Sequence, residues 1–137
     1  MRLIVFIFLC CTNFAFSNTK ILGSALDANN QYVYVSEIED YITNSESIIY
    51  TTTVNERGQF MIDLEDVGIR KIVIRIKNSF AELYVQNNTT YYLEFPQESI
   101  DVINYFSGSE TEILFFNLDS TDINYKILGF EAWMDDE

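Results

Sequence analysis

Residues 59–77 read QFMIDLEDVGIRKIVIRIK, and this stretch decides the fold class. Its apolar residues recur at every second position in both halves: Phe60, Ile62 and Leu64, then Ile72, Ile74 and Ile76. A period of two, with β-branched residues on one side, is typical of half-buried antiparallel strands. We therefore expect strands at 59–64 and 70–77, separated by a turn at 65–68.

Positive charge gathers in the second of these strands, since four of the eight basic residues lie between 70 and 77. If this strand pairs with the preceding one, Asp63 and Glu65 would lie near Lys71 and Arg75. The preferred interpretation is a solvated face matched to acidic neighbours, in which each exposed ion pair contributes about 0–1 kcal/mol. The alternative is a basic face for an anionic ligand.

Similar segments occupy the chain on both sides of this stretch. Polar turns separate them, as at Asp27-Ala28-Asn29-Asn30 and at Asn55-Glu56-Arg57-Gly58, where Gly58 is free to take a positive φ. Further strands are expected at 19–27, 32–38, 48–54, 81–85, 91–95 and 112–118. Short strands without intervening helices predict an all-β domain over 18–118, an antiparallel two-sheet sandwich of the prealbumin type with about seven strands.

Residues 119–137 follow a different pattern. Ser120-Thr121-Asp122 offers N-cap chemistry, and apolar residues then recur at helical spacing. We expect a C-terminal amphipathic helix that docks on the sandwich or on a following domain. Its candidate interaction surface consists of Ile123, Ile127, Phe130 and Trp133.

The end of this helix is acidic, with Asp135, Asp136 and Glu137 in succession. Negative charge at the C-terminal end of a helix opposes the helix dipole, and no Gly or Asn follows Met134 as a cap. The preferred expectation is that the helix begins a downstream region of a longer parent chain. The alternative is a frayed C-terminus.

Residues 1–17, MRLIVFIFLCCTNFAFS, are typical of a secretory signal peptide. Arg2 precedes the apolar run Leu3–Cys11, and Ala15-Phe16-Ser17 supplies small residues for a signal peptidase. The apolar run is about half the roughly 20 residues that a spanning helix needs. We expect cleavage after Ser17, export to the periplasm or cell surface, and no membrane span in the mature chain.

The only two cysteines, Cys10 and Cys11, lie within this signal. Lipidation of one of them is the minor alternative, because bulky Leu9 stands before Cys10 where a small residue is preferred. The mature chain would carry no disulfide in an oxidising compartment and would depend on its apolar core for stability.

Composition excludes several classes of function. The net charge of −13 repels nucleic-acid phosphates and anionic lipid headgroups. The sequence has no histidine, and with the cysteines removed it lacks the usual base and the thiol of nucleophilic catalysis and the usual ligands of zinc. Serine and threonine are plentiful, but none stands in a nucleophile-elbow context. No spacing selects a carboxylate pair, so we predict no enzyme activity, no catalytic residue and no cofactor.

Two clusters contain oxygen ligands of the kind that calcium accepts. They are Glu37, Glu39 and Asp40 in one case and Asp27, Asn29 and Asn30 in the other. No EF-hand pattern is present, and solvated turn residues are the preferred interpretation, so no metal site is predicted.

The sequence has nine tyrosines, which could either fill the core or bind a ligand at the surface. Tyr32 and Tyr34 share a strand face, and Tyr91 and Tyr92 are adjacent. Exposed aromatic rows stack on sugars, whereas buried ones fill sandwich cores. Core filling is the preferred interpretation, and a glycan-binding module that uses exposed tyrosines is the alternative.

The order of motifs resembles a known family. Ile21-Leu22-Gly23-Ser24-Ala25, then Val54-Asn55-Glu56-Arg57-Gly58-Gln59-Phe60, then Leu83-Tyr84-Val85 and Thr90-Tyr91-Tyr92-Leu93 follow the signal. Over residues 19–95 this is similar to the carboxypeptidase-regulatory-like, transthyretin-like β-sandwich domains at the N-terminus of exported bacterial multidomain proteins, often thioredoxin-like ones.

The resemblance implies a seven-stranded sandwich with a non-catalytic role. Such a domain acts as a structural or interaction module of the cell envelope, with a downstream domain or an envelope protein as partner. Gly23, Gly58 and Phe60 carry over as structural positions only. A second alternative is an accessory domain of a thioredoxin-like redox protein, which requires a downstream Cys-x-x-Cys motif.

Overall fold

The computed structural model describes residues 18–65, 67–95, 109–110 and 112–135. The predicted signal peptide, with Cys10 and Cys11, lies outside these residues. No helix within the described ranges is long and apolar enough to cross a membrane.

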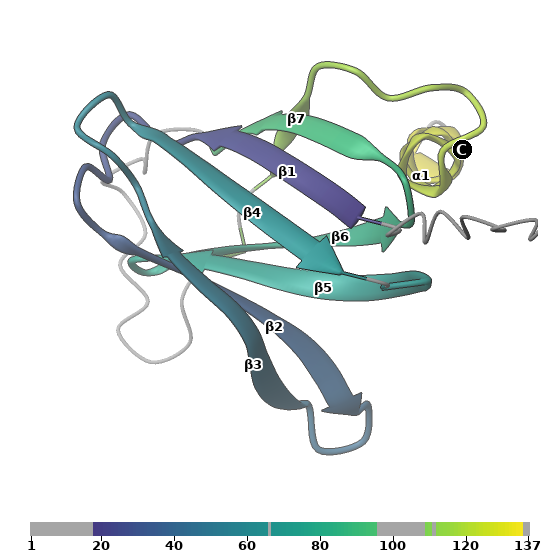
Figure 1. Ribbon diagram of the computed structural model, residues 1–137. Helices are drawn as coiled ribbons and strands as arrows, with labels where there is room; N and C mark the ends of the chain where they lie inside the picture. Colours follow the sequence, from purple (N-terminus) through teal and green to yellow (C-terminus); the bar gives the residue numbers. More distant parts are fainter. Residues whose placement is uncertain (1–17, 66, 96–108, 111, 136–137) are drawn as a thin grey trace, which may run out of the picture.

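Two sheets face each other across one core, which confirms the predicted all-β two-sheet sandwich (Figure 1). Sheet A has the order β4-β1-β7-β9, with β1 Asn18–Ser24, β4 Gln59–Glu65, β7 Thr90–Glu94 and β9 Leu114–Phe115. Sheet B has the order β3-β2-β5-β6-β8, with β2 Tyr32–Asp40, β3 Ser45–Thr53, β5 Ile69–Ile76, β6 Ser79–Gln86 and β8 Ser109–Glu110. The seven strands β1–β7 match the expected segments to within three residues at each end, whereas the segment expected at 112–118 contributes only the short β9.

β4 and β5 do not pair, so the expected approach of Asp63 and Glu65 to Lys71 and Arg75, which depended on that pairing, is wrong. β4 pairs antiparallel with β1, and Asp63 lies opposite Lys20. β5 belongs to the other sheet, and the apolar sides of β4 and β5 meet across the core. β1 also pairs with β7, in parallel.

The cations of β5 find acidic partners within sheet B instead. Lys71 pairs with Glu82 of β6, and Arg75 pairs with Glu46 of β3 at 2.5 Å. Arg70 pairs with Glu37 of β2, also at 2.5 Å. The interpretation of a charge-matched face is therefore confirmed, although the matching residues differ from those expected.

The core consists of the inward rows of both sheets. Its most deeply buried side chains include Ile21, Ile62, Tyr91 and Leu93 from sheet A and Val33, Val35, Ile72, Ile74, Leu83 and Val85 from sheet B. At Gly23 the inward row has no side chain, and the Phe60 ring occupies that space. A Cβ at Gly23 would lie 2.5 and 2.6 Å from Cε1 and Cε2 of Phe60 and closer still to Cζ.

The turn before β4 depends on Gly58 and Asn55. Gly58 has φ = 73°, the positive value expected from the sequence. The Asn55 side-chain oxygen accepts hydrogen bonds from the backbone N–H of Arg57 and of Gln59, both at 2.9 Å. This local network fixes the turn and orients the Asn55 amide.

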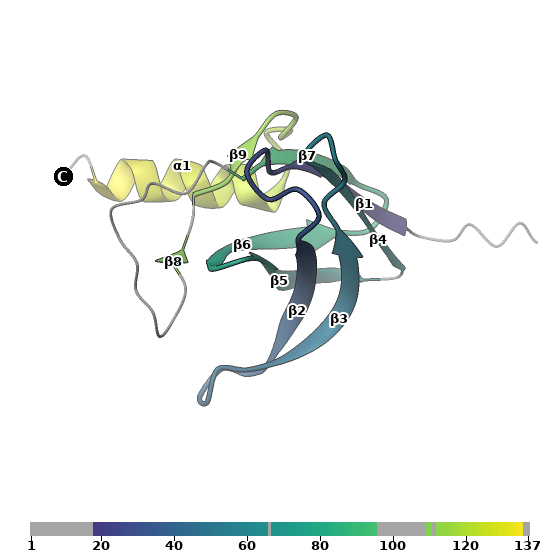
Figure 2. The same cartoon turned by 90° about the vertical axis from the view of Figure 1, so that its left-hand side faces the viewer.

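The predicted helix is α1, Ile123–Asp135. Asp122 caps it, accepting a 2.7 Å hydrogen bond from the backbone N–H of Asn124. The helix begins beside β6 and β7, and its C-terminal part extends past the two sheets (Figure 2).

Candidate functional site

The start of α1 is attached to sheet B by a polar side chain. Asn124 is buried, and its amide accepts a hydrogen bond from the Tyr84 N–H at 2.8 Å and donates one to the Tyr84 carbonyl at 2.7 Å. Both Tyr84 groups lie on β6, on the edge away from β5, so the asparagine takes the place of a neighbouring strand. No sequence pattern singles out this residue, because an asparagine near an N-cap is ordinary in any helix.

Asn117 makes an equivalent contact with sheet A. Its amide accepts from the Tyr92 N–H at 2.8 Å and donates to the Thr90 carbonyl at 2.7 Å. The Phe116 N–H adds a 2.9 Å bond to the Tyr92 carbonyl. The backbone of Tyr92 is thereby held on both its donor and its acceptor side.

A buried polar cluster lies beneath the start of α1. Asp122 is 3% exposed and receives a long, 3.5 Å contact from the Gln86 amide. Burial and then the charge of Asp122 raise the pKa of the Tyr91 phenol. Asp122 also accepts hydrogen bonds from the backbone N–H and the side-chain amide of Asn124, at 2.7 and 2.9 Å, so the cluster ties the first turn of the helix to the sandwich.

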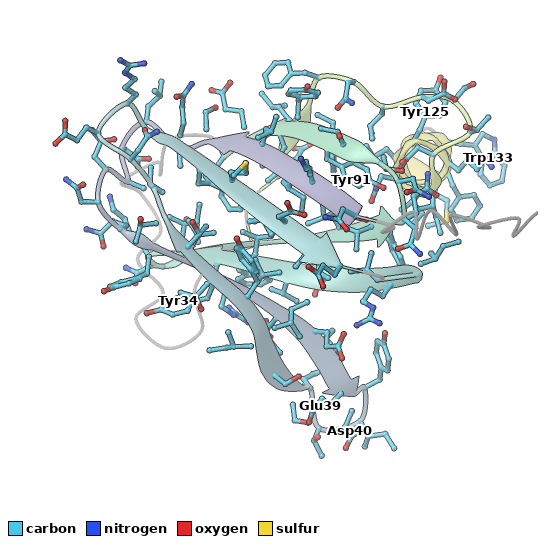
Figure 3. The ribbon with its side chains drawn as sticks, viewed as in Figure 1. Tyr34, Glu39, Asp40, Tyr91, Tyr125 and Trp133 are labelled. Carbon is cyan, nitrogen blue, oxygen red and sulfur yellow. The ribbon has the colours of Figure 1, made fainter. Side chains whose placement is uncertain are left out.

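The four predicted surface residues of α1 fall on two sides. Ile123 and Ile127 are half-buried on the sandwich side, whereas Phe130 and Trp133 are 57% and 58% exposed. The two exposed rings pack together with centroids 5.8 Å apart. Figure 3 shows Trp133 on the side of the helix that faces away from the sheets. Met134 is also exposed and extends this patch.

A groove of about 690 Å³ separates α1 from the sandwich. Apolar side chains of both parts line it, among them Leu83, Ile113 and Ile127, and Lys71 and Glu82 lie in its wall. The helix therefore packs on sheet B mainly through its first turns, and its apolar end remains uncovered within the described structure.

The tyrosines do not all fill the core, so the preferred interpretation is wrong for three of them. Tyr91 is buried, but Tyr32, Tyr34 and Tyr92 are 59%, 40% and 46% exposed. Tyr32 and Tyr34 stack on each other with centroids 5.9 Å apart. Figure 3 shows Tyr34 on the side of sheet B away from sheet A. In β2 tyrosine and valine alternate, and both residue types favour strands. Val33 and Val35 face the core, and Tyr32 and Tyr34 face outward.

The exposed tyrosines of β2 border an ordered network on sheet B. The Arg75 guanidinium binds Glu46 with two hydrogen bonds of 2.5 and 3.2 Å and lies 4.8 Å from the centre of the Phe80 ring. The Ser36 hydroxyl donates to Glu46 at 2.5 Å. The hydrogen bonds from Arg75 outweigh partial burial and lower the pKa of Glu46.

Two carboxylates of the first candidate calcium cluster, Glu37, Glu39 and Asp40, bind other groups of the protein. Glu37 binds Arg70. The Asp40 carboxylate accepts hydrogen bonds from the Ile42 N–H and the Thr43 hydroxyl, both at 2.8 Å, and these bonds lower the pKa of Asp40. Figure 3 shows Glu39 and Asp40 near the tip of the β2–β3 hairpin. Within the described ranges no three histidine, cysteine or acidic residues are grouped as metal ligands.

The outer face of sheet A contains a second hollow, of about 570 Å³, which we call the trough. Its first wall is the cross-strand row of Met61, Leu22 and Tyr92, which are neighbours in register on β4, β1 and β7. Phe116 extends this apolar wall. The floor is the backbone of the next row, where Phe60 and Leu93 turn their side chains to the core and Gly23 has none.

The second wall of the trough is polar. Ser24 and Gln59 are neighbours in the register of β1 and β4, and Thr53 and Asn55 stand beside them. Glu94 continues the same row but does not line the hollow. The sequence alone indicates part of the trough. Met61 and Tyr92 are large apolar residues on the outward side of strands whose inward side is already apolar.

No family model matches the chain, and no curated protein sequence is similar to it.

Proposed function

We propose that the chain is a non-catalytic module of an exported cell-envelope protein, where it serves as a structural or interaction domain next to a further domain of a longer protein. Its family would be the carboxypeptidase-regulatory-like, transthyretin-like one that the sequence resembles. The two-sheet fold is consistent with that family, and it carries no further weight because a fold does not specify a function.

The observation that supports this proposal is the uncovered apolar end of α1. Phe130, Trp133 and Met134 are each more than half exposed, while the start of the same helix is fixed by Asn124. A cluster of large apolar side chains in water is unfavourable and is typical of an interaction surface. We infer that a partner covers it, either the further domain or another envelope protein.

Oxidative footprinting of the protein purified from its native host tests this proposal. Met134 and Met61 are matched probes, because they are 56% and 53% exposed and lie on α1 and on sheet A. In the isolated chain both should oxidise at similar rates. In the native product we expect Met134 and Trp133 to be protected severalfold and Met61 to remain reactive.

The same sample gives the intact mass and the N-terminal sequence. We expect a product that begins at Asn18 and is heavier than residues 18–137 alone, or that retains a bound partner. Equal oxidation of Met134 in the native product and in the isolated chain would contradict the proposal. A thioredoxin-like further domain is one form of it, and this form requires a Cys-x-x-Cys motif in that domain.

A second candidate function is glycan binding, and the exposure of Tyr32, Tyr34 and Tyr92 favours it. Aromatic side chains with free faces offer stacking surfaces for sugar rings. Saturable binding of a polysaccharide in affinity electrophoresis would support this candidate, and unchanged mobility in every polysaccharide gel would count against it.

A further inference from the structure

The trough on sheet A has the size and chemistry of a small-molecule site. Its volume of about 570 Å³ lies within the range of roughly 300–1,000 Å³ that is typical of ligand pockets. Large side chains supply one wall and small polar side chains supply the other. Ligand sites of proteins commonly combine apolar area with a few polar groups that fix orientation.

The trough is uncharged, although the chain has 21 acidic and eight basic residues. Every residue that lines it is neutral. A charged ligand would lose its hydration there without gaining an ionic partner, which is unfavourable. The lining therefore selects a neutral ligand.

The polar wall offers unused hydrogen-bonding groups. The side chains of Ser24, Thr53 and Gln59 make no hydrogen bond within the described ranges. The Asn55 oxygen is occupied by two backbone N–H groups, which fixes the amide and leaves its NH₂ as a donor. The wall therefore presents both donors and acceptors, as hydroxyl groups require.

The backbone beneath the aromatic end of the apolar wall is fixed. The Asn117 side chain and the Phe116 N–H bind the N–H and the carbonyl of Tyr92, and Phe116 lines the trough with it. A wall whose backbone is ordered before binding loses less conformational freedom when a ligand arrives. Tyr32 and Tyr34 differ in another respect, because they stack on each other and each ring covers part of one face of the other.

We propose that the trough binds one ring of a neutral saccharide, with the C–H face of the ring against Tyr92 and Met61 and its hydroxyl groups toward Ser24, Gln59 and Asn55. A pyranose ring has an apolar face and a polar edge, which match the two walls. This inference rests on the glycan-binding candidate and assigns its site to sheet A.

Titration of the ¹⁵N-labelled protein with maltose, cellobiose and diacetylchitobiose tests the proposal. At least one of these sugars should shift the backbone amide signals of Leu22, Ser24 and Met61 in a saturable manner at millimolar concentrations. Tyr92→Ala should weaken binding at least tenfold. Tyr34→Ala is the matched control, since it removes an exposed tyrosine from the other sheet, and it should leave the affinity within about twofold.

If Tyr92→Ala fails to fold, Gln59→Ala provides the second test, because Gln59 is exposed on an edge strand, and it should weaken binding severalfold. Shifts confined to Tyr32 and Tyr34 and abolished by Tyr34→Ala would overturn the trough assignment while leaving the glycan-binding candidate standing. No saturable shift with any of the three sugars would overturn both. Occupation of the trough by N-acetyl-leucinamide but by none of the sugars would identify an apolar docking site and refute the proposal.

Discussion

Gly23→Ala is the sharpest test of the packing between the sheets. The new methyl group would overlap three atoms at the end of the Phe60 ring. That ring cannot simply swing aside, because it is buried and packs edge-on against Phe95 with centroids 6.2 Å apart. Overpacking of a core typically costs about 1–3 kcal/mol, and an overlap with three atoms of a buried ring places this change in the upper part of that range, at about 2–3 kcal/mol. The lower chain entropy of alanine in the unfolded state offsets about 0.5–1 kcal/mol, so we expect a net loss of about 1–2.5 kcal/mol.

Urea unfolding followed by far-ultraviolet circular dichroism measures this loss. Phe60→Leu shortens the ring side chain and alone should cost about 1–2 kcal/mol. Together with Gly23→Ala it should cost less than the sum of the two changes, because the overlap is gone, with a coupling of about 1 kcal/mol. Gly129→Ala is the matched control. Its new methyl group would meet no atom within 4 Å, and this helical site should become up to about 1 kcal/mol more stable.

Two results would refute this reasoning. One is a Gly23→Ala variant within about 0.5 kcal/mol of the parent, the usual range of a surface change. The other is a double variant whose loss equals the sum of the single losses, since additivity would mean that the two positions do not touch.

Three further changes have defined outcomes. Gly58→Ala forces a residue with a side chain to φ = 73° and should cost about 1–2 kcal/mol in the same urea assay, with a loss below about 0.3 kcal/mol contradicting it. Asn124→Ala leaves the Tyr84 N–H and carbonyl unpaired, so we expect a loss of about 2–3 kcal/mol and faster hydrogen exchange at Tyr84, and unchanged exchange would show that α1 is held otherwise. The pKa of Glu46 is lower in the folded protein than its ordinary value of 4.5. The ionised carboxylate therefore stabilises the fold at pH values above 4.5, and this contribution is lost as the pH falls through the folded-state pKa. Thermal unfolding from neutral pH to about pH 3 should therefore show a shallower decline for Glu46→Gln than for the parent, and identical curves would exclude the contribution of the Arg75 contact.

The alternation of residues predicted where the strands lie but not which strands are neighbours. Ile62 and Ile72 were both predicted to face the core, and both are buried there, yet β4 and β5 lie in different sheets. A period of two fixes the side of a strand that faces the core, whereas the hydrogen-bonding partner depends on how the connection crosses between the layers. The charged residues did not predict the strand pairing either, because the chain has several acidic residues that could pair with Lys71 and Arg75. The structure pairs them with Glu82 and Glu46.

The candidate sites were less predictable for the same reason. Tyr32 and Val33 are both good strand formers, so alternation identified two rows without deciding which one the core would accept. Asn117 and Asn124 act on strands far away in the sequence, and no local pattern distinguishes them from ordinary loop or helix residues. The trough requires three strands in register, and its walls appear only when Leu22, Met61 and Tyr92 are brought together.

The position of β1 has a consequence for the order in which the protein folds. β1 is the first strand of the fold, yet one of its neighbours in sheet A is β7, with Lys20 opposite Thr90. Sheet B contains two hairpins between consecutive strands, β2–β3 and β5–β6, which close over short loops. Local pairings form faster than distant ones because less chain must be brought together. During synthesis or translocation from the N-terminus, β1 can pair with β4 first but must wait for β7, and we expect sheet A to be completed last, when β7 and then β9 arrive.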